Sequence, residues 1–97
     1  MTIGNNVILW SGNHVGHDTV IEDHCFITSH VVLAGWVVVG SNSFIGINAT
    51  IRDHVKIGKG NVIGAGALII KDTQDGCMYK TQPAQLSEQS IKKLKWI

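Results

Sequence analysis

The chain has 97 residues, of which 44% are hydrophobic and 15% are charged, and its formal net charge is +1. These values predict one folded domain, and they exclude a chain that is disordered throughout. The small net charge argues against a nucleic-acid partner, and no apolar run of about 18 residues predicts a membrane span. Cys25 and Cys77 form no disulfide framework, and no export leader opens the chain, so we expect a cytoplasmic protein.

An aliphatic residue stands at every sixth position from the start of the chain to about Thr73. The twelve are Ile3, Leu9, Val15, Ile21, Ile27, Leu33, Val39, Ile45, Ile51, Ile57, Ile63 and Ile69. Neither an α-helix, with 3.6 residues per turn, nor a simple alternating strand produces a period of six. The period predicts short parallel strands that turn a corner every six residues and close a triangular coil every eighteen. The aliphatic residue and the residue four places later, mostly small or β-branched, should both point inward. Residues 1–74 are therefore expected to form an all-β parallel β-helix of about four coils.

The stretch Asn13–His30 holds four of the five histidines, namely His14, His17, His24 and His30. In an eighteen-residue coil all four fall on outward positions, and residues eighteen apart should stack. His17 should lie below Gly35, Asp53 and Lys71. His30 should lie below Asn48 and Gly66.

A zinc site would need two or more imidazoles directed at one point. The residues two coils above His14, His17 and His24 are Thr50, Asp53 and Gly60, and none of them is a histidine. We therefore expect no metal, and a metal-dependent hydratase is the least favoured function.

His17 and Asp18 occupy adjacent corner positions, where an acidic neighbour can fix the tautomer of an imidazole. Gly35, one coil above, would leave space over the ring and offer a backbone N–H to a developing oxyanion. This pattern favours His17 as a general base that Asp18 orients. The same two residues also suit a plain polar turn, and the pair alone does not separate the two interpretations.

The residues after Thr73 lose the six-residue period. The segment from Asp75 to Gln85 predicts a connecting loop, and Ser87 with Glu88 predicts the start of a short helix that runs to Ile97. The apolar residues of this helix would cap the open coil or pack on a partner; they are Ile91, Leu94 and either Trp96 or Ile97. Residues 75–97 should belong to the same domain as the coil.

The run GNHVGHDTVIEDHCFITSHVVLAGWVVVGSNSFIGINATIRD, residues 12–53, resembles the bacterial sugar acetyltransferases of the hexapeptide-repeat superfamily. The resemblance is closest to nucleotide-amino-sugar N-acetyltransferases and sialic-acid O-acetyltransferases, and it covers roughly residues 3–84. It implies a left-handed coil, a homotrimer, and transfer of acetyl from acetyl-CoA to an amine or hydroxyl of a sugar. It also implies that His17 and Asp18 are catalytic and that Gly35 supports the thioester.

Further expectations follow from this resemblance. Coenzyme A should run along a groove between subunits past Ile47, Asn48 and Ala65, and Lys71 is a candidate phosphate contact. His14 and His30 should line the acceptor side. Trp10 and Trp36 lie at outward positions, which makes them candidates for subunit contacts.

The sequence also departs from these relatives. Phe26 stands where some of them carry a second histidine, and Thr81–Ala84 reads TQPA in place of GxPA. The relatives' N-terminal domain, which grips the nucleotide-sugar, precedes the coil and is not part of this sequence. The alternative function is therefore a non-catalytic β-solenoid that binds or assembles without turnover.

Overall fold

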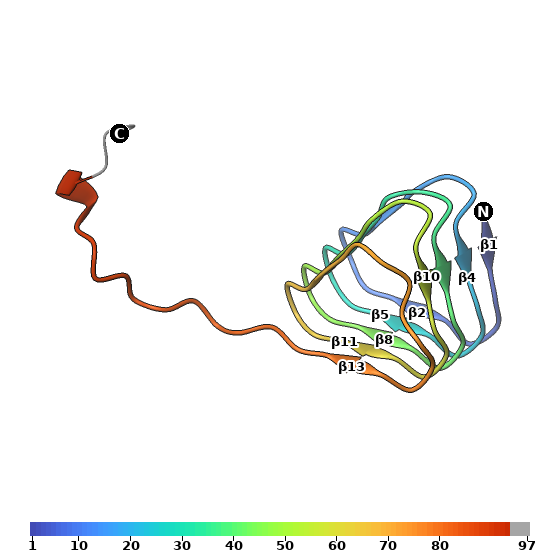
Figure 1. Cartoon of the computed structure of the whole chain (residues 1–97). Helices are drawn as coiled ribbons and strands as arrows, with labels where there is room; N and C mark the ends of the chain where they lie inside the picture. The colour runs from blue at the N-terminus through green and yellow to red at the C-terminus, as the bar shows by residue number, and fades with distance from the viewer. Residues whose placement is uncertain (94–97) are drawn as a thin grey trace.

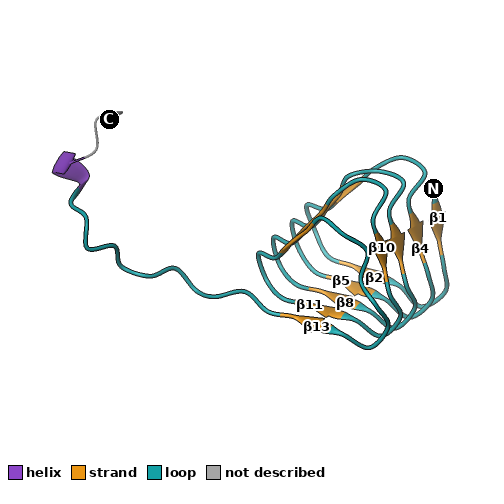
Figure 2. Ribbon diagram, viewed as in Figure 1, coloured by secondary structure: helices purple, strands orange, loops and turns teal. Residues whose placement is uncertain are grey.

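A computed structural model describes residues 1–93, of which residues 2–79 wind into one coil of short parallel strands (Figures 1 and 2). Each strand has two residues, and as far as Ile69 each turn between strands has four, as the six-residue period predicts. The strands are β1 (Thr2–Ile3), β2 (Ile8–Leu9), β3 (His14–Val15), β4 (Val20–Ile21), β5 (Phe26–Ile27), β6 (Val32–Leu33), β7 (Val38–Val39), β8 (Phe44–Ile45), β9 (Thr50–Ile51), β10 (Lys56–Ile57), β11 (Val62–Ile63), β12 (Leu68–Ile69) and β13 (Met78–Tyr79).

The strands form three parallel sheets, which are the three faces of a prism. The first sheet has the order β1-β4-β7-β10, the second β13-β11-β8-β5-β2, and the third β12-β9-β6-β3. Up to β12 the paired residues are eighteen apart, for example Thr2 with Val20 and Leu33 with Ile51. The predicted all-β parallel β-helix with eighteen-residue coils is therefore confirmed.

The inward aliphatic residues stack into three columns that form the core. Ile21, Ile27, Leu33, Val39 and Ile45 are all 0% exposed. Inward residues four places later are buried as well; they are Thr19, Cys25, Val31, Val37, Ser43, Ala49, Val55, Asn61 and Ala67. Burial raises the pKa of the Cys25 thiol, whereas the Cys77 side chain is only partly buried.

The first coil leaves its end of the core open. Ile3 and Leu9 begin two of the aliphatic columns and are 45% and 39% exposed, because no coil lies beneath them.

The corners of the prism depend on a left-handed backbone conformation at every sixth residue. Positive φ angles between 50° and 76° occur at Asn6, Gly12, Asp18, His24, His30, Trp36, Asn42, Asn48, His54, Gly60 and Gly66. Glycine, asparagine, aspartate and histidine accept this conformation more readily than other residues, whereas a bulky residue there is an outlier. Three of the histidines are therefore explained as corner residues, and Trp36 is the exception in the series.

The end of the coil differs from the prediction. The last coil has sixteen residues instead of eighteen, so that Met78 pairs with Val62 at a spacing of sixteen. Backbone bonds of 3.0 Å from Thr73 N to Lys56 O and of 2.8 Å from Gly76 N to Lys59 O hold this turn on the coil below. The coil thus continues past residue 74 into β13, which the strict period did not predict.

The predicted helix from Ser87 to Ile97 is wrong at its start. Residues 81–90 run as an extended exposed segment away from the coil (Figure 1), and only the 3₁₀ helix η1 (Ile91–Lys93) follows. Such a short helix is marginal in water unless it packs against something. Ile91 is 65% exposed and does not cap the coil. Leu94, Trp96 and Ile97 lie outside the described residues. Within residues 1–93, no helix has the length and apolar character needed to cross a membrane.

Candidate active site

The corner between the third and first sheets brings most of the predicted catalytic residues together. It consists of residues 17–18, 35–36, 53–54 and 71–72, and we call it the His17 edge. Trp36 N donates to His17 O and His54 N donates to Gly35 O, both at 3.0 Å, which stacks successive coils in register. The predicted vertical order of His17, Gly35, Asp53 and Lys71 is therefore the order in the structure.

His17 and Asp18 contact each other as predicted. The distance from His17 Nδ1 to Asp18 Oδ2 is 3.0 Å, and the side chains are 70% and 59% exposed. The hydrogen bond from His17 holds the pKa of the Asp18 carboxyl below its ordinary value. Because an ionised carboxylate only accepts hydrogen bonds, Nδ1 carries a proton, and in the neutral form of the imidazole the lone pair is then on Nε2. No hydrogen bond from residues 1–93 reaches Nε2, so the geometry suits a general base.

Gly35 lies one coil above His17 and is buried. A Cβ added there would meet only His17 O, at an ordinary 3.6 Å, but the φ of 128° is one that L side chains rarely adopt. Backbone conformation, rather than a lack of space, therefore requires glycine. Among the described residues, the Gly35 N–H has no acceptor.

Trp36 occupies part of the space that was expected to be open beside His17. Its ring centroid lies 4.2 Å from that of His17 at an interplanar angle of 75°. On its other side, it stacks on His54 at 5.0 Å and 10°. Gly35 itself adds no side chain over the imidazole, but the side chain of the next residue lies against the ring, and the His17 side chain remains 70% exposed. Trp36, a candidate for a subunit contact, packs within its own chain.

Sequence reasoning missed a second His–Asp pair on the same edge. His54 Nδ1 lies 2.8 Å from Asp53 Oδ2, and this hydrogen bond holds the pKa of the Asp53 carboxyl below its ordinary value. The sequence could have predicted this pair, because Asp53 and His54 are adjacent and lie two coils above His17 and Asp18. The coil above this pair carries Lys71 and Asp72 where the coil above His17 carries Gly35.

The predicted coenzyme residues lie on a different corner. Residues 11–12, 29–30, 47–48 and 65–66 form this second edge, between the second and third sheets. The bonds from His30 N to Ser11 O (3.0 Å) and from Asn48 N to Ser29 O (3.1 Å) stack it. The backbone N–H groups of Ile47 and Ala65 have no acceptor among residues 1–93. A line of free donors therefore follows this edge.

The third sheet separates the two edges within one chain, and His14 lies on its strand β3. His30, Ile47, Asn48 and Ala65 consequently do not join His17 and Gly35 in a single-chain site.

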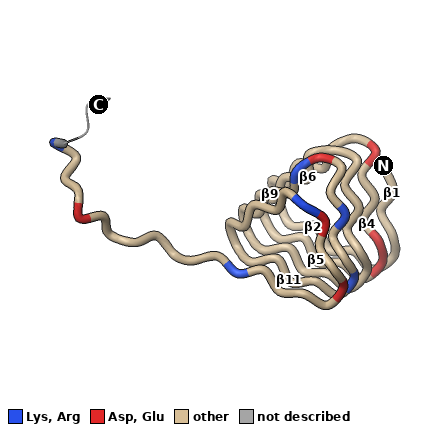
Figure 3. The backbone as a smooth tube through the Cα atoms, viewed as in Figure 1, with Lys and Arg blue, Asp and Glu red and all other residues tan. Residues whose placement is uncertain are grey.

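The outer face of the second sheet is apolar. Its outward residues are Ile8, Phe26, Phe44, Val62 and Met78, and Figure 3 shows no charged residue on these strands. Trp10 extends the face, since its ring packs edge-on against Phe26 at 5.0 Å, and Phe26 packs against Phe44 at 5.4 Å. Phe26, which stands where some relatives have a histidine, is thus part of an aromatic row.

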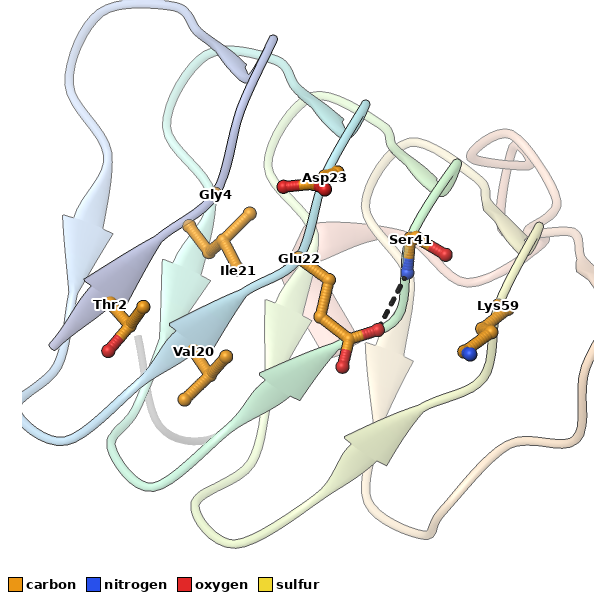
Figure 4. Close-up of a pocket in the computed structure, with 8 residues that line it drawn as sticks. All are labelled: Thr2, Gly4, Val20, Ile21, Glu22, Asp23, Ser41 and Lys59. Atoms are coloured by element: carbon orange, nitrogen blue, oxygen red, sulfur yellow. Dashed lines mark hydrogen bonds between the residues drawn. The ribbon is translucent and has the colours of Figure 1, made fainter.

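Two hollows lie away from the His17–Asp18 pair. The first, about 400 Å³, is lined by Thr2, Gly4, Val20, Ile21, Glu22, Asp23, Ser41 and Lys59 (Figure 4). Its carboxylates serve the fold, because Glu22 Oε1 accepts from Ser41 N at 3.1 Å and Asp23 Oδ1 from Asn5 N at 2.6 Å. The second, about 440 Å³, lies at the C-terminal end of the coil and includes Lys71 and Tyr79. Over residues 1–93 no group of three or more histidine, cysteine, aspartate or glutamate side chains could hold a metal ion.

Comparison with known proteins finds acyltransferases. A protein of Bacillus subtilis (strain 168) with the provisional name acetyltransferase YvoF is 35% identical over 86 residues, covering 89% of this chain and 46% of its own length. The acyl-(acyl-carrier-protein)–UDP-N-acetylglucosamine O-acyltransferase of Helicobacter pylori (strain Shi470) is 36% identical, covering 77% of this chain and 28% of its own length. The acetyltransferase domain of PglB from Neisseria gonorrhoeae FA1090 superposes with a TM-score of 0.40 at 23% identity, over 87% of this chain and 53% of that domain.

The chain thus spans less than half the length of these two curated relatives. The family described as bacterial transferase hexapeptide (six repeats) matches residues 1–35 and 37–71, which is most of the coil. Its six-residue repeats fit the left-handed β-helix, and the strands observed here follow the same period. The chain belongs to the bacterial transferase hexapeptide family.

Proposed function

We propose that the protein is an acetyl-CoA-dependent acyltransferase that acts on an amine or hydroxyl of a sugar or nucleotide-sugar. The observation that carries the proposal is the His17–Asp18 pair, which lies one coil below the N–H of Gly35. Neither His17 Nε2 nor this N–H has a hydrogen-bond partner among residues 1–93. Membership of the hexapeptide family and the acyltransferase names of the relatives support it.

In this reaction His17 Nε2 removes the proton of the acceptor as its oxygen or nitrogen attacks the thioester carbonyl. The Gly35 N–H donates to the oxyanion that develops on that carbonyl. The thiolate of coenzyme A leaves and receives the proton from His17. Asp18 keeps the Nδ1 proton in place and stabilises the imidazolium formed in between.

We propose that the donor lies along the second edge of a neighbouring subunit. There the free N–H groups of Ile47 and Ala65 suit an amide-rich chain, and Asn48 adds a side chain that can donate or accept. Lys71, exposed on the His17 edge, is the candidate phosphate contact. We propose that His14 and His30 contact the acceptor. The name of one relative contains a different acyl donor, acyl carrier protein, and the activity assay below compares it with acetyl-CoA.

The activity is tested by incubating the protein with acetyl-CoA and a panel of amino-sugars and UDP-amino-sugars, and following release of free thiol. Acyl carrier protein loaded with acetyl is the second donor arm. A Cys77→Ser background removes the reactive protein thiol. We expect release with acetyl-CoA that depends on the acceptor. If no free thiol is released with any donor and acceptor, the non-catalytic solenoid is favoured. If thiol is released only with acetyl-loaded acyl carrier protein, the acyl donor is the carrier protein and not acetyl-CoA.

We also propose a homotrimer in the cytoplasm, where Cys25 and Cys77 stay reduced. The outer face of the second sheet is the candidate contact, because Phe44 is 38% and Met78 is 61% exposed and soluble monomers rarely expose continuous apolar surface. Light scattering should give about three times the chain mass of 10.5 kDa. The Phe44→Lys trimer should dissociate into monomers at a higher protein concentration than the wild-type trimer, because the substitution places a charge on the contact face. A wild-type monomer at micromolar concentration would contradict the trimer.

A further inference from the structure

We propose that Trp36 is a positioning residue that holds the imidazole of His17 in the orientation needed for proton transfer. The proposal rests on the proposed function of His17. It assigns the second pair, Asp53 and His54, to supporting the indole, so that one connected group of side chains runs along the His17 edge.

The backbone at Trp36 provides the first argument. Its φ of 50° is in the left-handed region, where every other corner residue from Asn6 to Gly66 is asparagine, aspartate, histidine or glycine. A bulky side chain in this region is strained, at a cost of roughly 1–3 kcal/mol. Local folding therefore favours a different residue at position 36, and such conflicts are expected at functional sites.

The contacts of the indole provide the second argument. Trp36 is 47% exposed, so burial of the side chain does not explain its presence. Instead its ring lies between two imidazoles, edge-on to His17 at 4.2 Å and parallel to His54 at 5.0 Å. The hydrogen bond between His54 Nδ1 and Asp53 Oδ2, 2.8 Å long, restrains the His54 ring in turn. The indole is thus held from above and touches His17 below.

His17 needs such a contact because it is exposed. Its side chain is 70% exposed, and the one hydrogen bond at Nδ1 still permits the ring to turn about its side-chain bonds. A second contact on the ring restricts the orientation of Nε2 before the acceptor arrives. Because misplacement of a catalytic group by about 1 Å can cost up to about a hundredfold in rate, loss of this contact should lower kcat rather than raise KM.

The test compares Trp36→Asn, Trp36→Phe and His54→Ala, with His24→Asn as the control at a corner outside the His17 edge, which should leave kcat unchanged. Trp36→Asn places a residue that suits the left-handed backbone, so its melting temperature should equal or exceed that of the wild type. Its kcat should fall about tenfold or more, with KM for acetyl-CoA within about twofold. Trp36→Phe retains an aromatic ring and should retain most of the kcat. His54→Ala should have a smaller loss in the same direction.

A second readout does not require turnover. The NMR resonance of the His17 Cε1 proton should move in Trp36→Asn, because the ring current of the indole is lost, while the His24 resonance stays in place. Wild-type kcat in Trp36→Asn, an unchanged His17 resonance, or a loss of kcat accompanied by a lower melting temperature would each overturn the proposal. If His17→Ala itself keeps full activity, the proposed function of His17 fails instead, so the two failures are distinguishable.

Discussion

Replacement of His17 by alanine is expected to lower kcat at least about a hundredfold, because general-base catalysis contributes about 10²–10⁴-fold. Binding of acetyl-CoA should be kept, since the proposed donor contacts at Ile47, Asn48 and Ala65 lie on the second edge, away from the imidazole. Steady-state kinetics with isothermal titration of acetyl-CoA measures both quantities. Asp18→Asn should lower kcat by a smaller factor, because the amide oxygen can still accept a hydrogen bond from His17 Nδ1 although the negative charge is lost.

The matched control is His24→Ala. His24 is also exposed, but it holds the left-handed corner position that Asp18 holds beside His17. Its Nδ1 contacts Asn6 Nδ2 at 3.0 Å on the remaining corner of the prism. We expect no change in its kcat. If His17→Ala stays active while His14→Ala, His30→Ala or His54→Ala is inactive, the base is a different histidine.

Replacement of Ile45 by alanine is expected to destabilise the protein by about 2–5 kcal/mol, the range for deleting a fully buried branched side chain. Ile45 is 0% exposed and lies in the column with Ile27 below and Ile63 above, so neither neighbour can close the cavity without breaking its own strand pairing. In a repeat fold each coil depends on its direct neighbours, and a defect in the middle therefore weakens both halves. Urea unfolding at one fixed protein concentration measures the change.

Ile70→Ala provides the control, because the same atoms are removed from a side chain that is 48% exposed. It should change the free energy of unfolding by about 0.5 kcal/mol or less. Equal effects of the two substitutions would show that the aliphatic column is not the stabilising core.

The fold was predictable because the period of six is a property of the whole chain. Each inward aliphatic residue must meet the one eighteen residues later, and the observed pairing of Ile21 with Val39 and of Ile27 with Ile45 follows directly. The contact of His17 with Asp18 was also predictable, because the two residues are adjacent at one corner. The position of His17 and Ala65 on two different edges also follows from the period, since the two residues differ in phase within the coil.

Three features were not predictable from the period. The last coil is two residues shorter than the others, so β13 does not follow the six-residue period and was not predicted. The extended segment after it has no packing partner within the described residues that would make a helix form. The contact of Trp36 with both imidazoles depends on side-chain rotamers at strained corners, and stacking order along the edge does not specify these.

A complementation experiment tests whether one active site is shared between subunits. His17→Ala removes the proposed base from the His17 edge, and Ala65→Trp should block the donor on the second edge, so that each variant alone is inactive. Co-expression at equal levels should restore about a quarter of the wild-type activity in the whole population of trimers, because a site is intact only where the subunit that supplies the His17 edge carries Ala65→Trp and the neighbour that supplies the second edge carries His17→Ala. If the mixture is no more active than the two variants alone, the site does not combine the His17 edge of one subunit with the second edge of the next.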